Sequence, residues 1–324
     1  MEILVAILGV AVAILVAAVI AILFLMLATK RIASDAERRV PRSGKLVDVD
    51  GNRIHYVERG EGQSILFIHG LGAQLHQFRQ PLFTCFSDGF RLIAFDRPGS
   101  GYSRRAPEAG GTLTEQATVV KRLIETLELD RPLLVGHSLG GAVALATGIL
   151  YPDSVSGLAL LSPHTHAGGK VPPQFKPLDI KSPFRRRLLS WTVAVPTARK
   201  YAAQTLAFVF APQKAPDDYM TEGGGYLGLR PSHFYATATD FVDARRDAAE
   251  LEKRYGEITL PVGILFGTED RVIDHQVHGL GMVGRIAGLE LELAEGVGHM
   301  PQYAEPEKVA DFIRRMAARA AVPR

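Results

Sequence analysis

The stretch Leu133-Leu-Val-Gly-His-Ser-Leu-Gly-Gly141 decides the fold of this chain. Residues 132–135 form an apolar run suited to a buried strand, and the small and apolar residues 141–150 predict a helix. Between the two lies a G-x-S-x-G pattern centred on Ser138. On a sharp strand-to-helix turn such a serine is lifted from the sheet with its hydroxyl exposed. Glycines flank it because a Cβ would collide with the neighbouring strand or helix.

The rest of the chain alternates predicted strands with predicted helices. Because several of these strands are apolar on both faces, we expect a largely parallel sheet covered by helices on both sides. In such sheets functional residues gather outside the carboxyl ends of the strands. Strands are predicted at residues 45–49, 53–59, 63–68, 91–95, 132–135, 155–161, 261–266 and 289–293, and helices at 112–129 and 307–321.

Residues 163–231 interrupt this alternation. They contain no convincing strand and are rich in proline and aromatic residues, with helix-like segments at 184–194 and 199–210. So many apolar residues would not stay exposed in surface loops, so we interpret the segment as an inserted helical lid. The basic and aromatic residues of 184–191 suit a membrane interface, although a solvated helix with a packed tryptophan fits the same pattern. Residues 45–162 and 232–324 then form the core.

The N-terminal residues differ from the rest in composition. Residues 3–28 carry no charge and would span roughly 39 Å as a helix, more than the ~30 Å hydrocarbon core of a bilayer. A cleaved signal peptide would need a basic start and a shorter apolar run. A helix that is apolar on all sides is more typical of a membrane span than of a core helix. We therefore predict a transmembrane anchor over residues 1–28.

The charges around this anchor predict its orientation. Residues 29–44 are polar and basic and read as a juxtamembrane linker, whereas Glu2 is the only charged side chain before the apolar run. The positive-inside rule then predicts a single-pass protein of the cell membrane with its main domain in the cytoplasm. Cys85 is the only cysteine, so no internal disulfide forms, which fits a reducing compartment.

The overall composition excludes some functional classes. The 324 residues are 47% hydrophobic, enough for one large domain with appendages. The 37 basic and 34 acidic residues leave a net charge of +3, which is no signature of a nucleic-acid partner. The histidines are scattered without zinc-like spacing. We predict no metal and no cofactor.

Four motifs, each after a predicted strand, make the chain resemble the α/β-hydrolase fold family over residues 45–323. His69-Gly-Leu-Gly72 resembles the oxyanion loop and Gly136-His-Ser-Leu-Gly140 the nucleophile elbow. Gly267-Thr-Glu-Asp270 is similar to the acid turn, and Gly298-His299 to the histidine loop. Their order, Ser then Asp then His, is that of the family. The resemblance implies an α/β fold with a mostly parallel sheet of about eight strands, helices on both faces and an inserted helical lid. The N-terminal transmembrane helix is added to this fold by the composition of residues 1–28.

The resemblance also implies roles for individual residues. Ser138 would be the nucleophile, His299 the base that takes its proton, and Asp270 the acid that orients the imidazole. The backbone N–H groups of Leu71 and Leu139 would bind the oxyanion. Alternatives to Asp270 within the same region are Glu269 and Asp274. Candidate substrate contacts are His69, which could instead orient the oxyanion loop, His164 and Trp191.

The identity of the nucleophile narrows the reaction. Family members that act on epoxides or haloalkanes use an aspartate at the elbow, so Ser138 favours acyl transfer to water. Single-span, lidded lipases of monoacylglycerols have a similar layout. The sequence therefore predicts a membrane-anchored carboxylesterase or monoacylglycerol-type lipase for lipid or small-molecule acyl esters. Alternatives are a carbon–carbon hydrolase of ring-cleavage products, a lactonase, a thioesterase, or a non-catalytic ligand-binding protein on the same scaffold. The sequence does not define the leaving group, the acyl length or the oligomeric state.

Overall fold

The apolar segments of the chain assemble into one eight-stranded sheet. The computed structural model describes residues 1–169 and 171–321. The strand order is β1-β2-β4-β3-β5-β6-β7-β8, and only the β1–β2 and β2–β4 pairs are antiparallel. The predicted eight-stranded, mostly parallel sheet is confirmed. The strands are β1 (Lys45–Val49), β2 (Asn52–Arg59), β3 (Gly62–Ile68), β4 (Gly89–Phe95), β5 (Leu133–His137), β6 (Gly157–Leu161), β7 (Val262–Gly267) and β8 (Glu290–Ala294).

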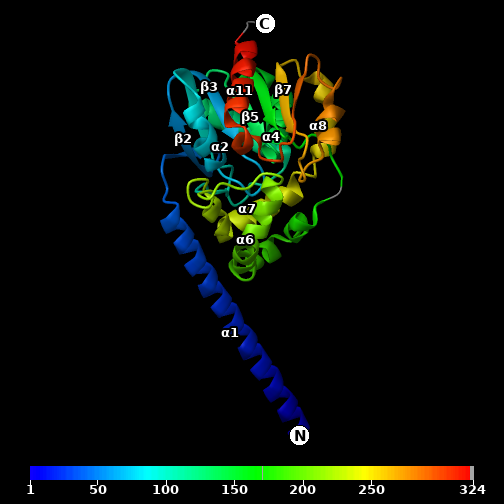
Figure 1. The fold of residues 1–324 in the computed structure, drawn as a ribbon. Coiled ribbons are helices and arrows are strands. Elements are labelled where there is room, and N and C mark those ends of the chain that lie inside the picture. Colours follow the sequence, from blue (N-terminus) through cyan, green and yellow to red (C-terminus); the bar gives the residue numbers. More distant parts are fainter. Residues whose placement is uncertain (170, 322–324) are drawn as a thin grey trace.

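Helices cover both faces of the sheet, which explains why its central strands are apolar throughout (Figure 1). One face packs against α3 (Leu113–Thr126) and α4 (Leu139–Leu150), and the other against α2 (His76–Leu82) and α11 (Pro306–Ala320). The apolar stripe predicted for the last helix, which includes Phe312, is fully buried against the sheet. Short helices α8 (Ala248–Glu252), α9 (His275–His278) and α10 (Pro301–Ala304) fill the connections.

The predicted lid is a layer of helices at one end of the core (Figure 1). It contains α5 (Pro183–Trp191), α6 (Ala194–Phe210) and the 3₁₀ segments η3 (Pro173–Leu178) and η4 (Gly225–Leu229). Helix α7 (Pro231–Asp243) packs against α5, α6 and η4. The helical layer therefore continues through Asp243, beyond the expected boundary at residue 231.

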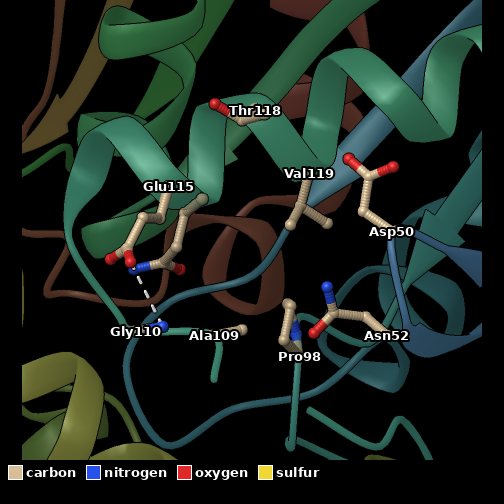
Figure 2. A pocket seen from close by; sticks show the side chains of 9 residues that line it. Asp50, Asn52, Pro98, Ala109, Gly110, Glu115, Thr118 and Val119 are labelled. Carbon is tan, nitrogen blue, oxygen red and sulfur yellow. Dashed lines mark hydrogen bonds between the residues drawn. The ribbon is translucent and has the colours of Figure 1, made fainter. Parts of the chain in front are cut away.

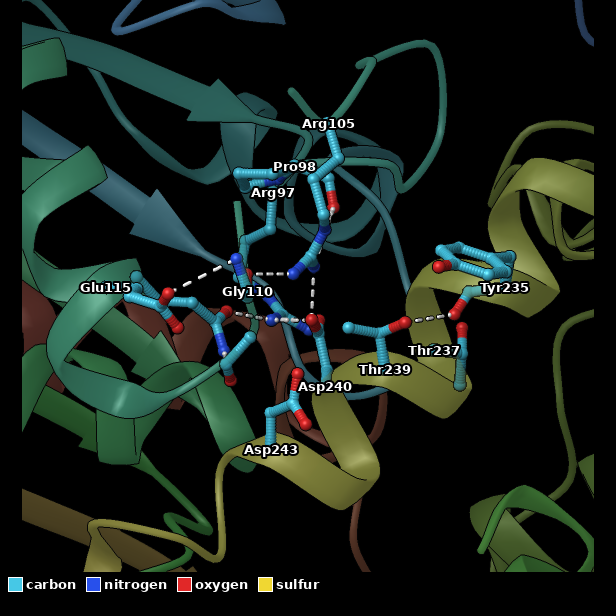
Figure 3. A network of polar contacts seen from close by, with 12 residues as sticks. Arg97, Pro98, Arg105, Gly110, Glu115, Tyr235, Thr237, Thr239, Asp240 and Asp243 are labelled. Atoms are coloured by element: carbon cyan, nitrogen blue, oxygen red, sulfur yellow. Dashed lines mark hydrogen bonds and ion pairs between the residues drawn. The ribbon is translucent and has the colours of Figure 1, made fainter. Parts of the chain in front are cut away.

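A buried charge network fastens this layer to the core. Arg97, in the turn after β4, places Nη1 2.6 Å from Oδ2 of Asp240 on α7, and both side chains are 1% exposed. Arg105 pairs with the other carboxylate oxygen (Figure 3). On the lid side, Arg186 of α5 donates to the hydroxyl of Thr239 at 2.7 Å. Because an unpaired charge is costly in the interior, these pairs favour one placement of α7 over the core.

The N-terminal helix α1 (Glu2–Arg39) is longer than the predicted span. It runs through most of the stretch expected to be a linker, since no glycine or proline interrupts residues 10–39 and Pro41 follows its end. Its first part projects away from the core (Figure 1). Within the described residues it is the one helix long and apolar enough to cross a membrane, so it is a candidate membrane span.

Candidate active site

The nucleophile elbow has the sharp geometry expected from its glycines. Ser138 separates β5 from α4 with φ 53° and ψ −120°, a conformation that few residues other than glycine adopt. A Cβ on Gly140 would lie 2.0 Å from the carbonyl oxygen of Ile68, and one on Gly136 would lie 2.5 Å from that of Gly140. The elbow is therefore closed by backbone packing that no other residue permits.

The backbone of Ser138 is fixed, whereas its hydroxyl is free. The N–H donates to the carbonyl of Leu161 on β6 at 3.1 Å. The carbonyl accepts from the N–H groups of Gly141 at 2.9 Å and His164 at 3.0 Å. Among the described residues, no hydrogen bond to the hydroxyl is recorded. Catalytic hydrogen bonds of this kind often tighten only when substrate is bound.

The acid turn and the histidine loop meet at the carboxyl edge of the sheet. His299 Nδ1 lies 2.7 Å from Oδ2 of Asp270, whose side chain is fully buried. The other carboxylate oxygen accepts the N–H groups of Val272 at 2.8 Å and Ile273 at 2.9 Å. A carboxylate held in this way fixes the tautomer of the imidazole, with its proton on Nδ1.

The two alternative acids lie elsewhere. Asp274 accepts the N–H of Gln276 at 2.9 Å and caps α9. Glu269 is exposed on the turn. Of the acidic residues that the structure describes, only Asp270 pairs with His299, so its geometry fits the expected position of the acid.

His137 ties the histidine loop to the elbow. Its ring centroid lies 4.7 Å from that of His299, and its Nε2 lies 2.7 Å from the His299 carbonyl oxygen. Gln77 Nε2 donates to His137 Nδ1 at 2.6 Å. Burial, followed by the charge of His299, lowers the pKa of His137 well below its usual value, so this ring stays neutral. The sequence analysis assigned no role to Gln77, because helix α2 carries no pattern that identifies it.

The oxyanion loop packs directly against the elbow. A Cβ on Gly70 would lie 3.1 Å from Cβ of Ser138. Among the described residues, no acceptor is recorded for the N–H groups of Leu71 and Leu139, the two expected donors. Leu139 opens α4, where the helix dipole adds positive potential. Within the described part of the chain, this leaves the two expected donors without a recorded partner close to Ser138.

His69, a predicted substrate contact, lies in the interior beside the oxyanion loop. The side chain is fully buried, and its Nδ1 lies 2.8 Å from the Gly70 carbonyl oxygen. Its Nε2 accepts the N–H of Arg97 at 2.9 Å, so both ring nitrogens are occupied. These two contacts fit the alternative that the sequence left open, in which His69 orients the oxyanion loop.

His164 and Trp191 lie in different surroundings. The His164 ring stacks 4.8 Å from that of His278, which the sequence did not single out. Burial lowers the pKa of His164 to about 4 and that of His278 to about 3, so both rings are neutral at neutral pH. Because the N–H of His164 bonds to Ser138, this pair lies beside the elbow. Trp191 ends α5 at the junction with α1, and no recorded contact among the described residues joins it to the elbow.

A separate hollow of about 200 Å³ lies beside the β1–β2 turn and the start of α3. Its polar walls include Asp50, Asn52 and Glu115 (Figure 2). Glu115 is engaged in capping α3 through Thr112. The hollow contains none of the residues of the triad or the oxyanion loop, so we do not assign it to the candidate site.

Comparison with known proteins agrees with this geometry. The family described as alpha/beta hydrolase fold matches residues 63–306. The chain is 26% identical over 297 residues to the 2-hydroxy-6-oxononadienedioate/2-hydroxy-6-oxononatrienedioate hydrolase of Paraburkholderia xenovorans (strain LB400), covering 88% of this chain and 99% of the relative. It is also 26% identical over 277 residues to the 2-hydroxy-6-oxo-6-phenylhexa-2,4-dienoate hydrolase of Comamonas testosteroni, covering 83% and 93%. These relatives favour the alternative prediction, hydrolysis of a carbon–carbon bond, over the ester prediction.

Solved structures share the fold at lower identity. A bacterial membrane phospholipase A matches with a TM-score of 0.69 and 22% identity over 100% of both chains. The meta-cleavage product hydrolase from Pseudomonas fluorescens IP01 matches with a TM-score of 0.70 and 19% identity, over 86% of this chain and 98% of that one. Identities this low indicate a common architecture and leave the reaction open.

Proposed function

The chain belongs to the α/β-hydrolase fold family, and we propose that it is a serine hydrolase that attacks a carbonyl carbon through Ser138. The observation that carries this proposal is the 2.7 Å pair between Asp270 and His299, held beside an elbow whose serine hydroxyl is free. A serine hydroxyl is a weak nucleophile at neutral pH and needs a base of this kind.

The proposed mechanism follows from these positions. As Ser138 Oγ bonds to the carbonyl carbon, His299 Nε2 takes its proton while Asp270 stabilises the resulting imidazolium. The carbonyl oxygen becomes an oxyanion, which the N–H groups of Leu71 and Leu139 bind; each such donor is commonly worth about 2.7–4 kcal/mol. His299 then returns the proton to the leaving group, and water releases the acyl group by the same steps.

We propose a carbon–carbon bond as the first candidate for the bond that breaks, because the similar curated proteins are hydrolases of 2-hydroxy-6-oxo dienoates. Cleavage leaves the bonding electron pair on carbon, and this carbon takes up the proton held by His299. A substrate of this class carries several oxygen atoms. The neutral imidazoles of His164 and His278 beside the elbow are suited to hydrogen-bond to them.

Ester hydrolysis at a membrane is the second candidate, and α1 is the observation that favours it. The helix is continuous over 38 residues and packs against the lid, which supports a retained anchor over a cleaved leader. The match to a membrane phospholipase A covers the whole chain, including this helix. A site next to a bilayer meets lipid esters at high local concentration. The cytoplasmic placement of the domain stays a prediction from charge.

One set of assays on the full chain in detergent tests both candidates. Loss of absorbance of 2-hydroxy-6-oxo-6-phenylhexa-2,4-dienoate measures carbon–carbon cleavage, and a series of nitrophenyl esters measures ester cleavage. Turnover of the dienoate above that of the esters supports the first candidate, and the reverse supports the second. Both activities should be absent from Ser138→Ala, which should also lose labelling by a fluorophosphonate probe. Equal labelling of wild type and variant would contradict the proposed nucleophile.

A further inference from the structure

Helix α1 presents a stripe of apolar and small residues to the lid. Thr29 and Ala36 are buried, and the partly buried residues around them repeat at helical spacing along the same side. The stripe begins inside the apolar run at Leu25, and α1 as a whole contacts α5, α6 and η4. The members of the stripe are Leu25, Ala28, Thr29, Ile32, Ala33 and Ala36.

One hydrogen bond fixes the height of the lid along this helix. The hydroxyl of Thr29, the first residue after the apolar run, donates to the carbonyl oxygen of Thr192 at 3.0 Å. The apolar run exceeds a hydrocarbon core by roughly 9 Å. If the extra length of the helix lies at its N-terminal end, Thr29 lies at the boundary of the hydrocarbon core. If it lies at the C-terminal end, Thr29 lies about 10 Å outside the core, so in both cases Thr29 is in the headgroup region. Thr192 and the adjoining end of α5 lie at the same depth.

Part of the exposed surface of the lid is apolar. Phe184, Leu188 and Trp191 follow one another at helical spacing on one face of α5 and are 75%, 43% and 42% exposed. Val193, which precedes α6, and Tyr201, on α6, are 43% and 47% exposed. Exposed apolar side chains gathered in this way mark an interaction surface. We call these five residues the apolar lid face.

Cations without recorded acidic partners occur in the same stretch of sequence as the apolar lid face. No acidic residue occurs between Asp179 and Asp217. Of the seven basic residues in that interval, Arg186 is buried in the lid. The other six are exposed, and no ion pair is recorded for them among the described residues. These six are Lys181, Arg185, Arg187, Arg199, Lys200 and Lys214.

From these observations we propose that the apolar lid face rests on an anionic bilayer, with Trp191 at headgroup level and Lys181, Arg185, Arg187, Arg199 and Lys200 paired with lipid headgroups. Aromatic and aliphatic side chains beside lysine and arginine form the usual composition of an interfacial helix, buried about 5–10 Å into the boundary. The inference rests on the proposed anchoring of α1. It is independent of which bond the site cleaves.

The sequence supplies its own reporter, because Trp191 is the only tryptophan. The full chain is reconstituted into vesicles of phosphatidylcholine and phosphatidylglycerol, with or without bromine near the headgroup end of the acyl chains. Flotation shows whether α1 anchors the chain. We expect Trp191 emission to be blue-shifted relative to detergent, to fall by about half or more with brominated lipid, and to be shielded from aqueous acrylamide.

Two matched comparisons separate docking from mere proximity. In Trp191→Phe/Ala318→Trp the reporter moves to an exposed position on α11, on the far side of the core from the lid (Figure 1), and bromine should leave its emission unchanged. Arg185→Glu/Lys200→Glu should lower the quenching in anionic vesicles, whereas Arg53→Glu/Arg104→Glu, an equal charge change at exposed residues outside the lid, should not.

Three results would overturn the proposal. The chain could float with the vesicles while Trp191 stays open to acrylamide and insensitive to bromine; the lid would then stand clear of the bilayer. If the blue shift of the Trp191 emission increases with protein concentration in detergent and brominated lipid does not quench the emission, the apolar lid face binds a second copy of the chain. If the chain does not float with the vesicles, α1 does not anchor it to the membrane. Hydrolytic activity in detergent is unaffected by any of these results, so the proposed function is judged separately.

Discussion

Replacing Asp270 with asparagine should preserve the fold and remove most of the activity. In the wild type, one carboxylate oxygen accepts two backbone N–H groups, from Val272 and Ile273, while the other meets His299 Nδ1 at 2.7 Å. Asparagine has a single oxygen, and the two N–H groups require it. Its NH₂ group must then face His299. The ring would accept that hydrogen bond at Nδ1 and carry its own proton on Nε2, where it cannot take the proton of Ser138.

The size of the loss follows from this change of tautomer. In serine hydrolases of known mechanism, the same substitution lowers kcat by about 10⁴-fold. At about 1.36 kcal/mol for each factor of ten, this corresponds to roughly 5.4 kcal/mol of transition-state stabilisation. The free energy of unfolding should change much less, because the variant keeps three hydrogen bonds at this position. Two are with the N–H groups of Val272 and Ile273, and one is with Nδ1 of His299.

The assay combines turnover with the rate of fluorophosphonate labelling, since labelling reports the reactivity of Ser138 whatever the natural substrate is. Glu269→Gln is the matched control: it makes the same chemical change one residue away, on an exposed side chain, and should behave like wild type. If Asp270→Asn kept more than about a tenth of the activity, the assignment of the acid and the tautomer argument would both be refuted.

Three further substitutions test the scaffold. Burial lowers the pKa of His55, but the Asp96 carboxylate 2.7 Å away has the larger effect and raises this pKa overall. The pair should therefore stabilise the fold at pH values below about 6.5, the pKa of histidine in an unfolded chain, and this stabilisation should be lost as the pH rises through the pKa of His55 in the folded protein. His55→Gln should flatten that alkaline decline in urea titrations. Asp240→Asn should cost about 3–5 kcal/mol of unfolding free energy, because it leaves Arg97 buried without its charge partner. Gly136→Ala should abolish the near-ultraviolet circular dichroism of the folded core, since its Cβ would lie 2.5 Å from a carbonyl oxygen.

The parts of the site that sequence predicted well are those with a local physical cause. The elbow was predictable because glycine spacing, a preceding apolar strand and a following helix all lie within nine residues. The meeting of Asp270 and His299 was predictable because both follow strands of one parallel sheet, whose carboxyl ends share an edge. The structure shows them at 2.7 Å.

The parts that sequence missed depend on partners far along the chain. Gln77 and His278 help to build the site, yet each lies in a short helix without a periodic pattern. His69 was located in the correct loop, but the direction of its ring is set by the N–H of Arg97, which no local pattern encodes. The extension of α1 was missed for a different reason. Its polar residues favour a linker by composition, and only contact with the lid explains the buried Thr29.

The catalytic geometry is the same for a carbon–carbon bond and for an ester, so the choice of substrate depends on what reaches Ser138. A lid that rests on an anionic bilayer would repel a dianion and would collect apolar molecules that partition into the membrane. Of the two relatives' substrates, the dienedioate carries two carboxylates, whereas the 6-phenyl dienoate carries one and has an apolar ring. Lipid esters satisfy the same condition. An anchored chain with its lid on the bilayer would therefore favour an apolar carbonyl compound with at most one negative charge near the reacting carbon, a property common to both candidate reactions.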